Sequence, residues 1–161
     1  MDALRFPIGP SPLLLRPLTP AERTDYLQQV ADLPAQLAAA AERLGTAGLA
    51  RPYRPGGWTG HQVIHHVADS HINAYCRFRL ALTEDNPTIK PYDEAGWAEL
   101  PDVAAVPVTV SLALLAHLQG TDWQRTFYHP EARQTSTLDQ ALATYAWHGR
   151  HHLAHLGLLE A

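Results

Sequence analysis

Four histidines lie close together late in the sequence, at His148, His151, His152 and His155, within a pattern that predicts a helix over residues 138–159. At about 100° per residue, His148 and His152 point about 40° apart on one helix face, one turn from each other. Such an H-x-x-x-H pair is the usual way in which one helix supplies two nitrogens to a divalent metal ion. Residues of the buried type share this arc: Ala141, Tyr145, Leu156 and Leu159. The imidazoles therefore point into the fold, where an unpaired polar group costs roughly 1–3 kcal/mol and a metal ion would satisfy two of them at once.

A second group of histidines lies in the segment G-H-Q-V-I-H-H-V-A-D-S-H, so that eight of the ten histidines fall in two predicted helices. A three-histidine metal site requires a third ligand from another helix. His71 lies in the apolar stripe of its helix, which favours a histidine hydrogen-bonded in the core, whereas His66 leads a separate polar face. Spacing alone leaves both as candidates for the inward side, and we expect His61 and His65 to face solvent.

The first predicted helix begins after Thr19, where T-P-A-E supplies an N-cap residue, a proline at the first helical position and a glutamate three residues after the cap. We expect it to end at about Leu44, with Gly45 as its stop. Pro34 lies inside it and should kink it or loosen one hydrogen bond. The proline-rich residues 1–18 should form an extended arm packed on the body.

The second predicted helix covers residues 59–83. Its expected buried stripe consists of seven apolar residues: Ile64, Val67, Ala68, Ile72, Tyr75, Phe78 and Leu82. Residues 84–107 then carry four prolines and no sustained period, which is typical of a long loop with a functional role.

A short third helix should end at Gly120, and Thr137 should cap the fourth. Four helical segments, almost no β-type alternation and one long crossover loop predict an all-α fold, an antiparallel four-helix bundle. At 161 residues, the chain should form one domain over residues 1–161.

Composition excludes several classes of protein. The formal net charge is −4 and the basic residues are dispersed, so the basic footprint of a nucleic-acid-binding protein is missing. The single cysteine, Cys76, excludes an internal disulfide and a cysteine-based zinc site. The sequence shows no signal-peptide pattern and no run near the ~20 apolar residues of a membrane span. We therefore expect a cytoplasmic protein with no nucleic acid and no membrane among its partners.

Several passages of the sequence resemble one known family. They are P-Y-R-P-G-G-W-T, H-H-V-A-D-S-H-I-N-A-Y-C-R-F-R-L-A-L-T-E, P-T-I-K-P-Y-D-E-A-G-W, F-Y-H-P and W-H-G-R-H-H-L-A-H. Together they resemble the YfiT branch of the DinB-like superfamily, over residues 7–159. The resemblance implies a four-helix bundle, a homodimer and one divalent metal ion held by three histidines.

Carried over onto this sequence, the resemblance places the ligand of the H-H-V-A-D-S-H passage at His66, not His71, and the other two at His148 and His152. The family bears the label of metal-dependent hydrolases, and related members conjugate low-molecular-weight thiols such as bacillithiol. This chain departs from the family in its third helix, which lacks about three turns, or roughly 11 residues, between Leu115 and Trp123. The predicted ligands lie outside that gap.

Three neutral nitrogen ligands leave the ion its positive charge and at least one exchangeable position, as in catalytic zinc sites. A water bound there would acidify toward a pKa of about 7, and a thiol would be held as thiolate, so hydrolysis and thiol transfer begin from the same site. Ligation by nitrogen alone suits Zn or Ni and does not exclude Fe, Mn or Co. The expected partner is a small-molecule substrate, with a low-molecular-weight thiol as one candidate.

Four polar residues near the predicted ligands are candidates for catalytic or substrate-binding roles: Asp69, Asn73, Arg77 and Tyr145. Thiol transfer is favoured because the fourth helix offers no carboxylate on the His148 arc, while Asn73 and Arg77 extend the His66 face as a polar anchor. The competing class is a non-catalytic metal or small-molecule binding module. In such a module a fourth side chain, that of His71, His151 or His155, would close the coordination of the ion.

Overall fold

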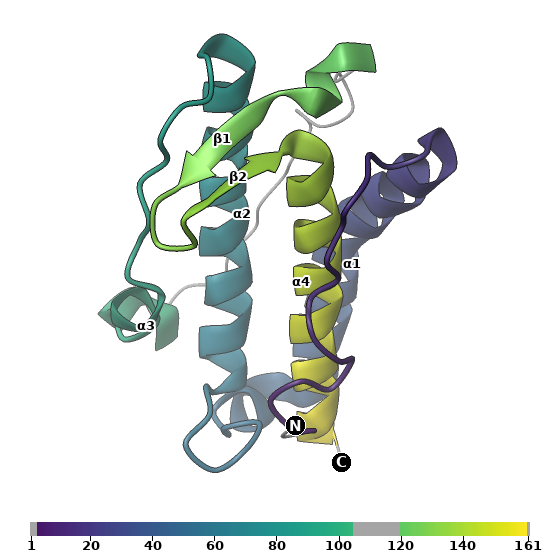
Figure 1. Cartoon of the computed structure of the whole chain (residues 1–161). Helices are drawn as coiled ribbons and strands as arrows, with labels where there is room; N and C mark the ends of the chain where they lie inside the picture. Colours follow the sequence, from purple (N-terminus) through teal and green to yellow (C-terminus); the bar gives the residue numbers. More distant parts are fainter. Residues whose placement is uncertain (1–2, 105–119, 161) are drawn as a thin grey trace.

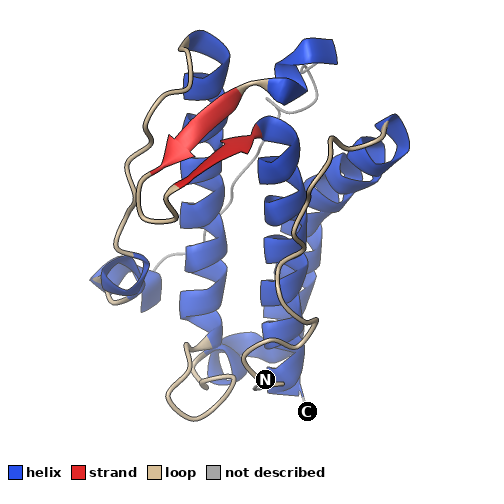
Figure 2. Ribbon diagram, viewed as in Figure 1, coloured by secondary structure: helices blue, strands red, loops and turns tan. Residues whose placement is uncertain are grey.

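The computed structural model describes residues 3–104 and 120–160, and three long helices form its body (Figures 1 and 2). These are α1 (Pro20–Leu49), α2 (Gly60–Thr83) and α4 (Leu138–Glu160). Shorter elements complete it: α3 (Glu94–Ala98), the 3-10 turns η1 (Pro101–Ala104) and η3 (Gly120–Gln124), and the strands β1 (Thr126–His129) and β2 (Gln134–Thr137). The predicted third helix lies within residues 105–119, outside the described residues.

The helix starts follow the sequence signals. Thr19 and Glu22 form a reciprocal capping box at α1, and Thr59 forms one at α2. At α4, the Gln140 backbone N–H donates to Thr137 Oγ1 at 3.1 Å and the Thr137 backbone N–H donates to Gln140 Oε1 at 2.8 Å. Because each cap satisfies N–H groups that a helix leaves unpaired, the three predicted starts are confirmed.

The first helix continues beyond its predicted stop. Gly45 has φ 59° and ψ 179°, and it is the residue inside α1 with non-helical angles. Helical structure resumes after this break and runs to Leu49. Gly45 therefore ends the regular helix as expected, but one further helical turn follows it. Pro34 lies inside α1, and because proline has no backbone N–H, one helical hydrogen bond is missing there, which is one of the two predicted effects.

The long helices have fixed relative directions. Arg23 bonds Asp139 and Arg43 bonds Glu160, each at 2.9 Å, so α1 and α4 run in the same direction. Gly60, at the start of α2, lies against Leu159, at the end of α4. The helix α2 is therefore antiparallel to α4, and Figure 1 shows it opposed to both neighbours.

A two-stranded hairpin precedes α4, and the sequence analysis missed it. Strand β1 pairs antiparallel with β2, in the register Thr126 opposite Thr137. Each strand has four residues and neither alternates apolar with polar residues, so the usual strand signal is missing. The first part of the predicted loop pairs with the hairpin, because the Tyr128 backbone N–H donates to Pro87 O at 2.8 Å. The rest of that loop contains α3 and η1, so it is more ordered than a long loop.

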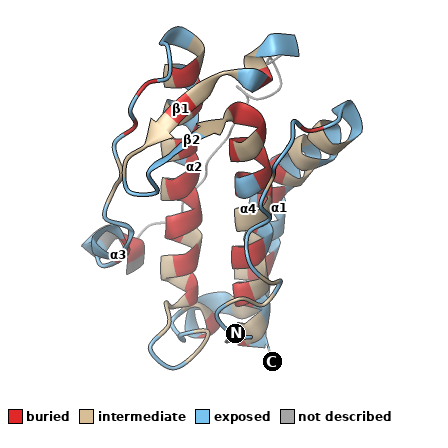
Figure 3. Cartoon of the chain, in the orientation of Figure 1, coloured by how far each residue is buried: buried red, intermediate tan, exposed pale blue. Residues whose placement is uncertain are grey.

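The buried face of α2 differs from the predicted stripe. Ile72 and Tyr75 are 49% and 37% exposed, although both were expected in the core. Val67, Ala68 and Phe78 of the predicted stripe are buried, and the buried face also includes His66, Ser70 and Ala74. Figure 3 shows buried residues concentrated where α2 and α4 face each other. The polar residues turn inward because they meet histidines of α4, which a hydrophobicity pattern does not register.

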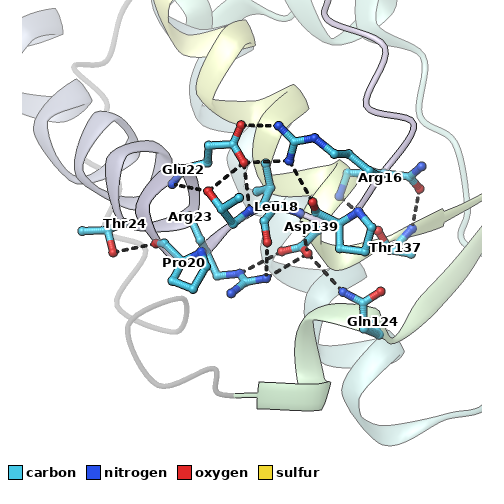
Figure 4. A network of polar contacts seen from close by, with 12 residues as sticks. Arg16, Leu18, Pro20, Glu22, Arg23, Thr24, Gln124, Thr137 and Asp139 are labelled. Atoms are coloured by element: carbon cyan, nitrogen blue, oxygen red, sulfur yellow. Dashed lines mark hydrogen bonds and ion pairs between the residues drawn. The ribbon is translucent and has the colours of Figure 1, made fainter.

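The proline-rich arm packs along α4, as expected, and a polar network anchors its last residues (Figure 4). Asp139 is completely buried and accepts hydrogen bonds from the Leu18 backbone N–H at 3.1 Å and from Gln124 Nε2 at 3.1 Å. Arg23 donates to both Asp139 carboxylate oxygens at 2.9 Å. One carboxylate thus joins the arm, α1, η3 and α4. None of the helices described is long and apolar enough to cross a bilayer.

Candidate metal centre

Three histidines from two helices converge between α2 and α4. His66 comes from α2, and His148 and His152 come from α4; one ligand atom from each lies within 4.8 Å of the others. The Nε2 atoms of His66 and His148 are 3.0 Å apart. Ring centroids are separated by 4.5 Å for His148–His152 and by 4.8 Å for His66–His152. The structure thus brings together the three residues that the family resemblance had named.

The local sequence explains this convergence. The i, i+4 spacing puts His148 and His152 on one face of α4, and the antiparallel α2 places His66 opposite them. Gly149 permits close packing behind that face, because a Cβ there would come within 2.5 Å of a Leu33 methyl carbon. Trp58 covers the other side, with its ring centroid 4.6 Å from that of His66.

All three imidazoles are neutral in this environment. Burial lowers the pKa of His66 from 6.5 to about 4, with smaller contributions from His71 and His151. Burial also holds the pKa values of His148 and His152 well below 6.5, followed by the charges of neighbouring imidazoles. Neutral imidazoles keep a lone pair for a metal ion, so the site is prepared for a cation at neutral pH.

These residues fit a divalent metal ion. The Nδ1 atoms of His66 and His148 are buried and have no hydrogen-bond partner among the described residues, while their Nε2 atoms face each other. Two neutral imidazoles held so close, with little else to bond, are stabilised by a shared cation. The donor set of three nitrogens suits Zn or a similar ion.

No fourth side chain from the described residues joins the group of potential ligands. His71 is buried, but its ring lies edge-on to Tyr145 at 5.9 Å between centroids, and burial lowers its pKa to about 4. The His151 ring stacks on Trp147 at 4.5 Å. His155 lies behind His152 on the side of the N-terminal arm. None of these three histidines belongs to the ligand group that the described residues form.

The two histidines expected to face solvent behave differently from each other. His65 is only 7% exposed, so that expectation was wrong for it. His61 is half-buried. His65 is buried because the rest of the fold covers a wider arc of α2 than its apolar residues indicate.

None of the four polar candidates belongs to the ligand group. The Arg77 Nη1 donates to the Tyr145 hydroxyl at 2.6 Å, and Asn73 Nδ2 donates to the Asp69 carbonyl oxygen at 2.9 Å. Burial raises the pKa of Tyr145, so its hydroxyl stays protonated. The Arg77 Nε is buried and has no hydrogen-bond partner among the residues that the structure describes.

Three groups that were not predicted from the sequence interact electrostatically with Arg77: Tyr92, Glu94 and His129. Burial raises the pKa of Tyr92 and, opposed by Arg77, that of Glu94. Burial, then Arg77, lowers the pKa of His129. These residues occur in the passages P-Y-D-E and F-Y-H-P, which were visible in the sequence. Their approach to Arg77 depends on how the loop and the hairpin fold back onto α2.

A helical bundle with three inward-facing neutral histidines defines a class of metal-binding bundle proteins. Residues 16–156 match the family model of the DinB superfamily. The chain belongs to the DinB superfamily.

Relatives of nearly the same length share about half of the sequence. A protein of Bacillus cereus (strain 03BB102) named "Putative metal-dependent hydrolase" is 49% identical over 167 residues, which cover 97% of this chain and 95% of the relative. A protein of the same description from Bacillus thuringiensis subsp. konkukian shows the same identity and coverage. Because the aligned length exceeds 161 residues, these relatives carry residues that this chain lacks. The expected shortening before Trp123 falls mainly on residues outside the described ranges.

A solved structure shares the fold. YfiT from Bacillus subtilis, described as "a probable metal-dependent hydrolase with an unusual four-helix bundle topology", superposes with a TM-score of 0.89 at 38% identity, covering 98% of this chain and 96% of that one. The predicted four-helix-bundle fold and the family resemblance are therefore confirmed. The relatives and the three-histidine group together support an enzyme that depends on a metal ion.

Proposed function

We propose that this protein transfers a low-molecular-weight thiol carrying an anionic group to an electrophilic small molecule, using one divalent ion, Zn or Ni, held by His66, His148 and His152. A divalent ion bound there supplies a Lewis acid that lowers the pKa of a thiol at its open position. Hydrolysis is the competing reaction. We also carry forward the homodimer and the cytoplasmic location as predictions.

The arrangement of Arg77 carries this proposal. Arg77 follows His66 by eleven residues, so it lies about 20° away on the same face of α2 and about 16 Å along the axis. Helical side chains lean toward the N-terminus, so the guanidinium reaches back toward the histidines. No ion pair joins Arg77 to a carboxylate within the described ranges. A guanidinium held by the Tyr145 hydroxyl is thus available for an anionic group of a substrate.

The ligand environment argues against the proton-transfer group that hydrolysis requires. The charges that shift the pKa values of His66, His148 and His152 come from other histidines, and no carboxylate appears among them. Glu94 and Asp69 act on Tyr92. Since no carboxylate of the described residues belongs to the ligand group, a reaction whose leaving group departs unaided is favoured.

The proposed step is a substitution. The thiol sulfur forms a bond to carbon of the electrophile, the leaving group departs with the bonding electron pair, and the thiol proton goes to water. The three histidines would bind the metal ion and so orient the thiol. Arg77 would bind the anionic end of the thiol, and the hydrogen bond to the Tyr145 hydroxyl positions Arg77. Burial of the histidines excludes bulk water from the sulfur.

The test compares an anionic and a neutral thiol. Metal-loaded protein is given mercaptosuccinate or mercaptoethanol with monochlorobimane, which releases chloride and becomes fluorescent. Arg77→Met should raise KM for mercaptosuccinate roughly tenfold to a hundredfold, the value of a hydrogen bond to a charged group, and should barely change KM for mercaptoethanol. Arg79→Met is the matched control, because Arg79 also donates to a tyrosine hydroxyl, that of Tyr75, but on the exposed side of α2.

Two results would overturn the proposal. Equal effects of Arg77→Met on KM for both thiols would show that Arg77 does not bind the anionic group of the thiol. Turnover only of nitrophenyl acetate or a simple amide, abolished in His148→Ala, would assign the site to hydrolysis.

A further inference from the structure

His155 joins a ligand histidine to the N-terminal arm. Its Nδ1 lies 3.3 Å from Nδ1 of His152, and its Nε2 lies 3.2 Å from the carbonyl oxygen of Arg5. The His155 side chain is only 2% exposed, and its ring stacks on Tyr53 with 4.0 Å between centroids and 18° between planes. Its place and its ring plane are therefore determined by the fold.

The proton positions follow from these partners. A carbonyl oxygen only accepts, so Nε2 of His155 must carry a proton. A neutral imidazole has one N–H, and therefore Nδ1 of His155 is an acceptor. The proton between the two Nδ1 atoms then belongs to His152, and the lone pair of His152 is on Nε2.

We propose that His155 is a positioning residue that, through the Arg5 carbonyl, holds His152 in the Nδ1–H tautomer and so presents Nε2 to the metal ion. Histidine ligands commonly donate their second N–H to a backbone carbonyl, which orients the ring and raises its basicity. Here a second histidine stands between ligand and carbonyl. The inference rests on the metal site of the proposed function and is independent of whether thiol transfer or hydrolysis takes place there.

The arrangement is particular to one ligand. The Nδ1 atoms of His66 and His148 have no partner among the described residues, so of the three ligands only His152 receives this support. The contacts from the Arg5 carbonyl through His155 to His152 also couple the N-terminal arm to the metal site, because docking of the arm near Arg5 favours the metal-binding tautomer of His152. By reciprocity, metal binding then stabilises the docked arm.

Two substitutions at His155 distinguish the loss of its hydrogen bonds from the loss of its ring packing. His155→Phe keeps an aromatic ring to stack on Tyr53 but removes both polar atoms, whereas His155→Gln keeps one acceptor and one donor. His151→Phe is the matched control, because His151 is a neighbouring buried histidine of α4 that stacks on aromatic rings. Zn affinity is measured by competition with a chromophoric chelator, unfolding of the metal-free variants in urea reports any folding defect, and nitrogen NMR of metal-free wild-type protein identifies the tautomer of His152.

We expect His155→Phe to weaken Zn binding roughly 10- to 100-fold, the usual effect of losing such a supporting group, with His155→Gln recovering most of it and His151→Phe unchanged. The NMR spectrum should show a protonated Nδ1 on His152. An Nε2–H tautomer in wild-type protein, or equal Zn affinities for His155→Phe and wild type, would overturn the inference. Wild-type protein that binds neither Zn nor Ni would instead refute the metal-dependent function, and the tautomer would still be decided.

Discussion

Replacing Asp139 by alanine should be strongly destabilising, because this completely buried carboxylate is the centre of a polar network (Figure 4). Its side chain is 0% exposed, and its partner Arg23 is 19% exposed. Asp139→Ala leaves the guanidinium without its counter-charge and the Leu18 N–H without an acceptor. Breaking a buried ion pair on one side costs about 3–5 kcal/mol. Because Arg23 retains some access to water, we expect a value near the lower end.

This loss translates into a large shift of the melting temperature. For a chain of 161 residues, each kcal/mol corresponds to roughly 2–4 °C, so a loss of about 3 kcal/mol in Asp139→Ala should lower Tm by about 6–12 °C. The assay is urea unfolding followed by circular dichroism, with thermal melts alongside. Glu160→Ala is the control, since it breaks the Arg43–Glu160 pair, whose side chains are 57% and 37% exposed. An exposed pair contributes about 0–1 kcal/mol.

The double variant Arg23→Leu with Asp139→Leu separates the charge effect from packing. Because it removes both charges, it should be less destabilised than Asp139→Ala, as is usual when a buried pair is replaced by apolar residues. The reasoning is refuted if Asp139→Ala costs no more than Glu160→Ala, or if the double variant is much less stable than the single one.

Three further predictions concern the histidines and the metal ion that they would hold. Alanine at His66, His148 or His152 should lower bound metal well below one ion per chain in elemental analysis, whereas His61→Ala should not; full occupancy in His66→Ala would contradict the ligand set. In metal-free protein, burial lowers the pKa values of His66 and His71 to about 4, against 6.5 in the unfolded chain. The unfolded chain therefore binds protons first, so the free energy of unfolding should be constant above about pH 6.5 and should fall steadily toward pH 4. Urea unfolding across this range checks the sign, and a loss of stability on raising the pH would contradict it. At 100 times Kd, added metal should contribute about 2.7 kcal/mol, and this stabilisation should persist below pH 6.5 because protons compete little for buried imidazoles.

Most of what the sequence predicted concerned local order. The capping residues Thr19, Thr59 and Thr137 marked the three helix starts correctly, because a cap is formed by residues within one turn. The spacing of His148 and His152 likewise put two potential ligands on one face, since helical periodicity alone sets that geometry. The passages shared with the DinB-like superfamily led to the bundle fold, which the comparison with YfiT confirmed.

What the sequence alone left open was decided by contacts between distant segments. Periodicity could not choose between His66 and His71, because both are buried and the choice depends on which of them faces His148 and His152 of α4. The hairpin before α4 was invisible, since its strands are short and are held by pairing rather than by pattern. The contact of His155 with the Arg5 carbonyl joins residues from opposite ends of the sequence, so only the folded chain brings them together. Helix starts depend on neighbouring residues, whereas the orientation of a ligand depends on whatever the fold places beside it.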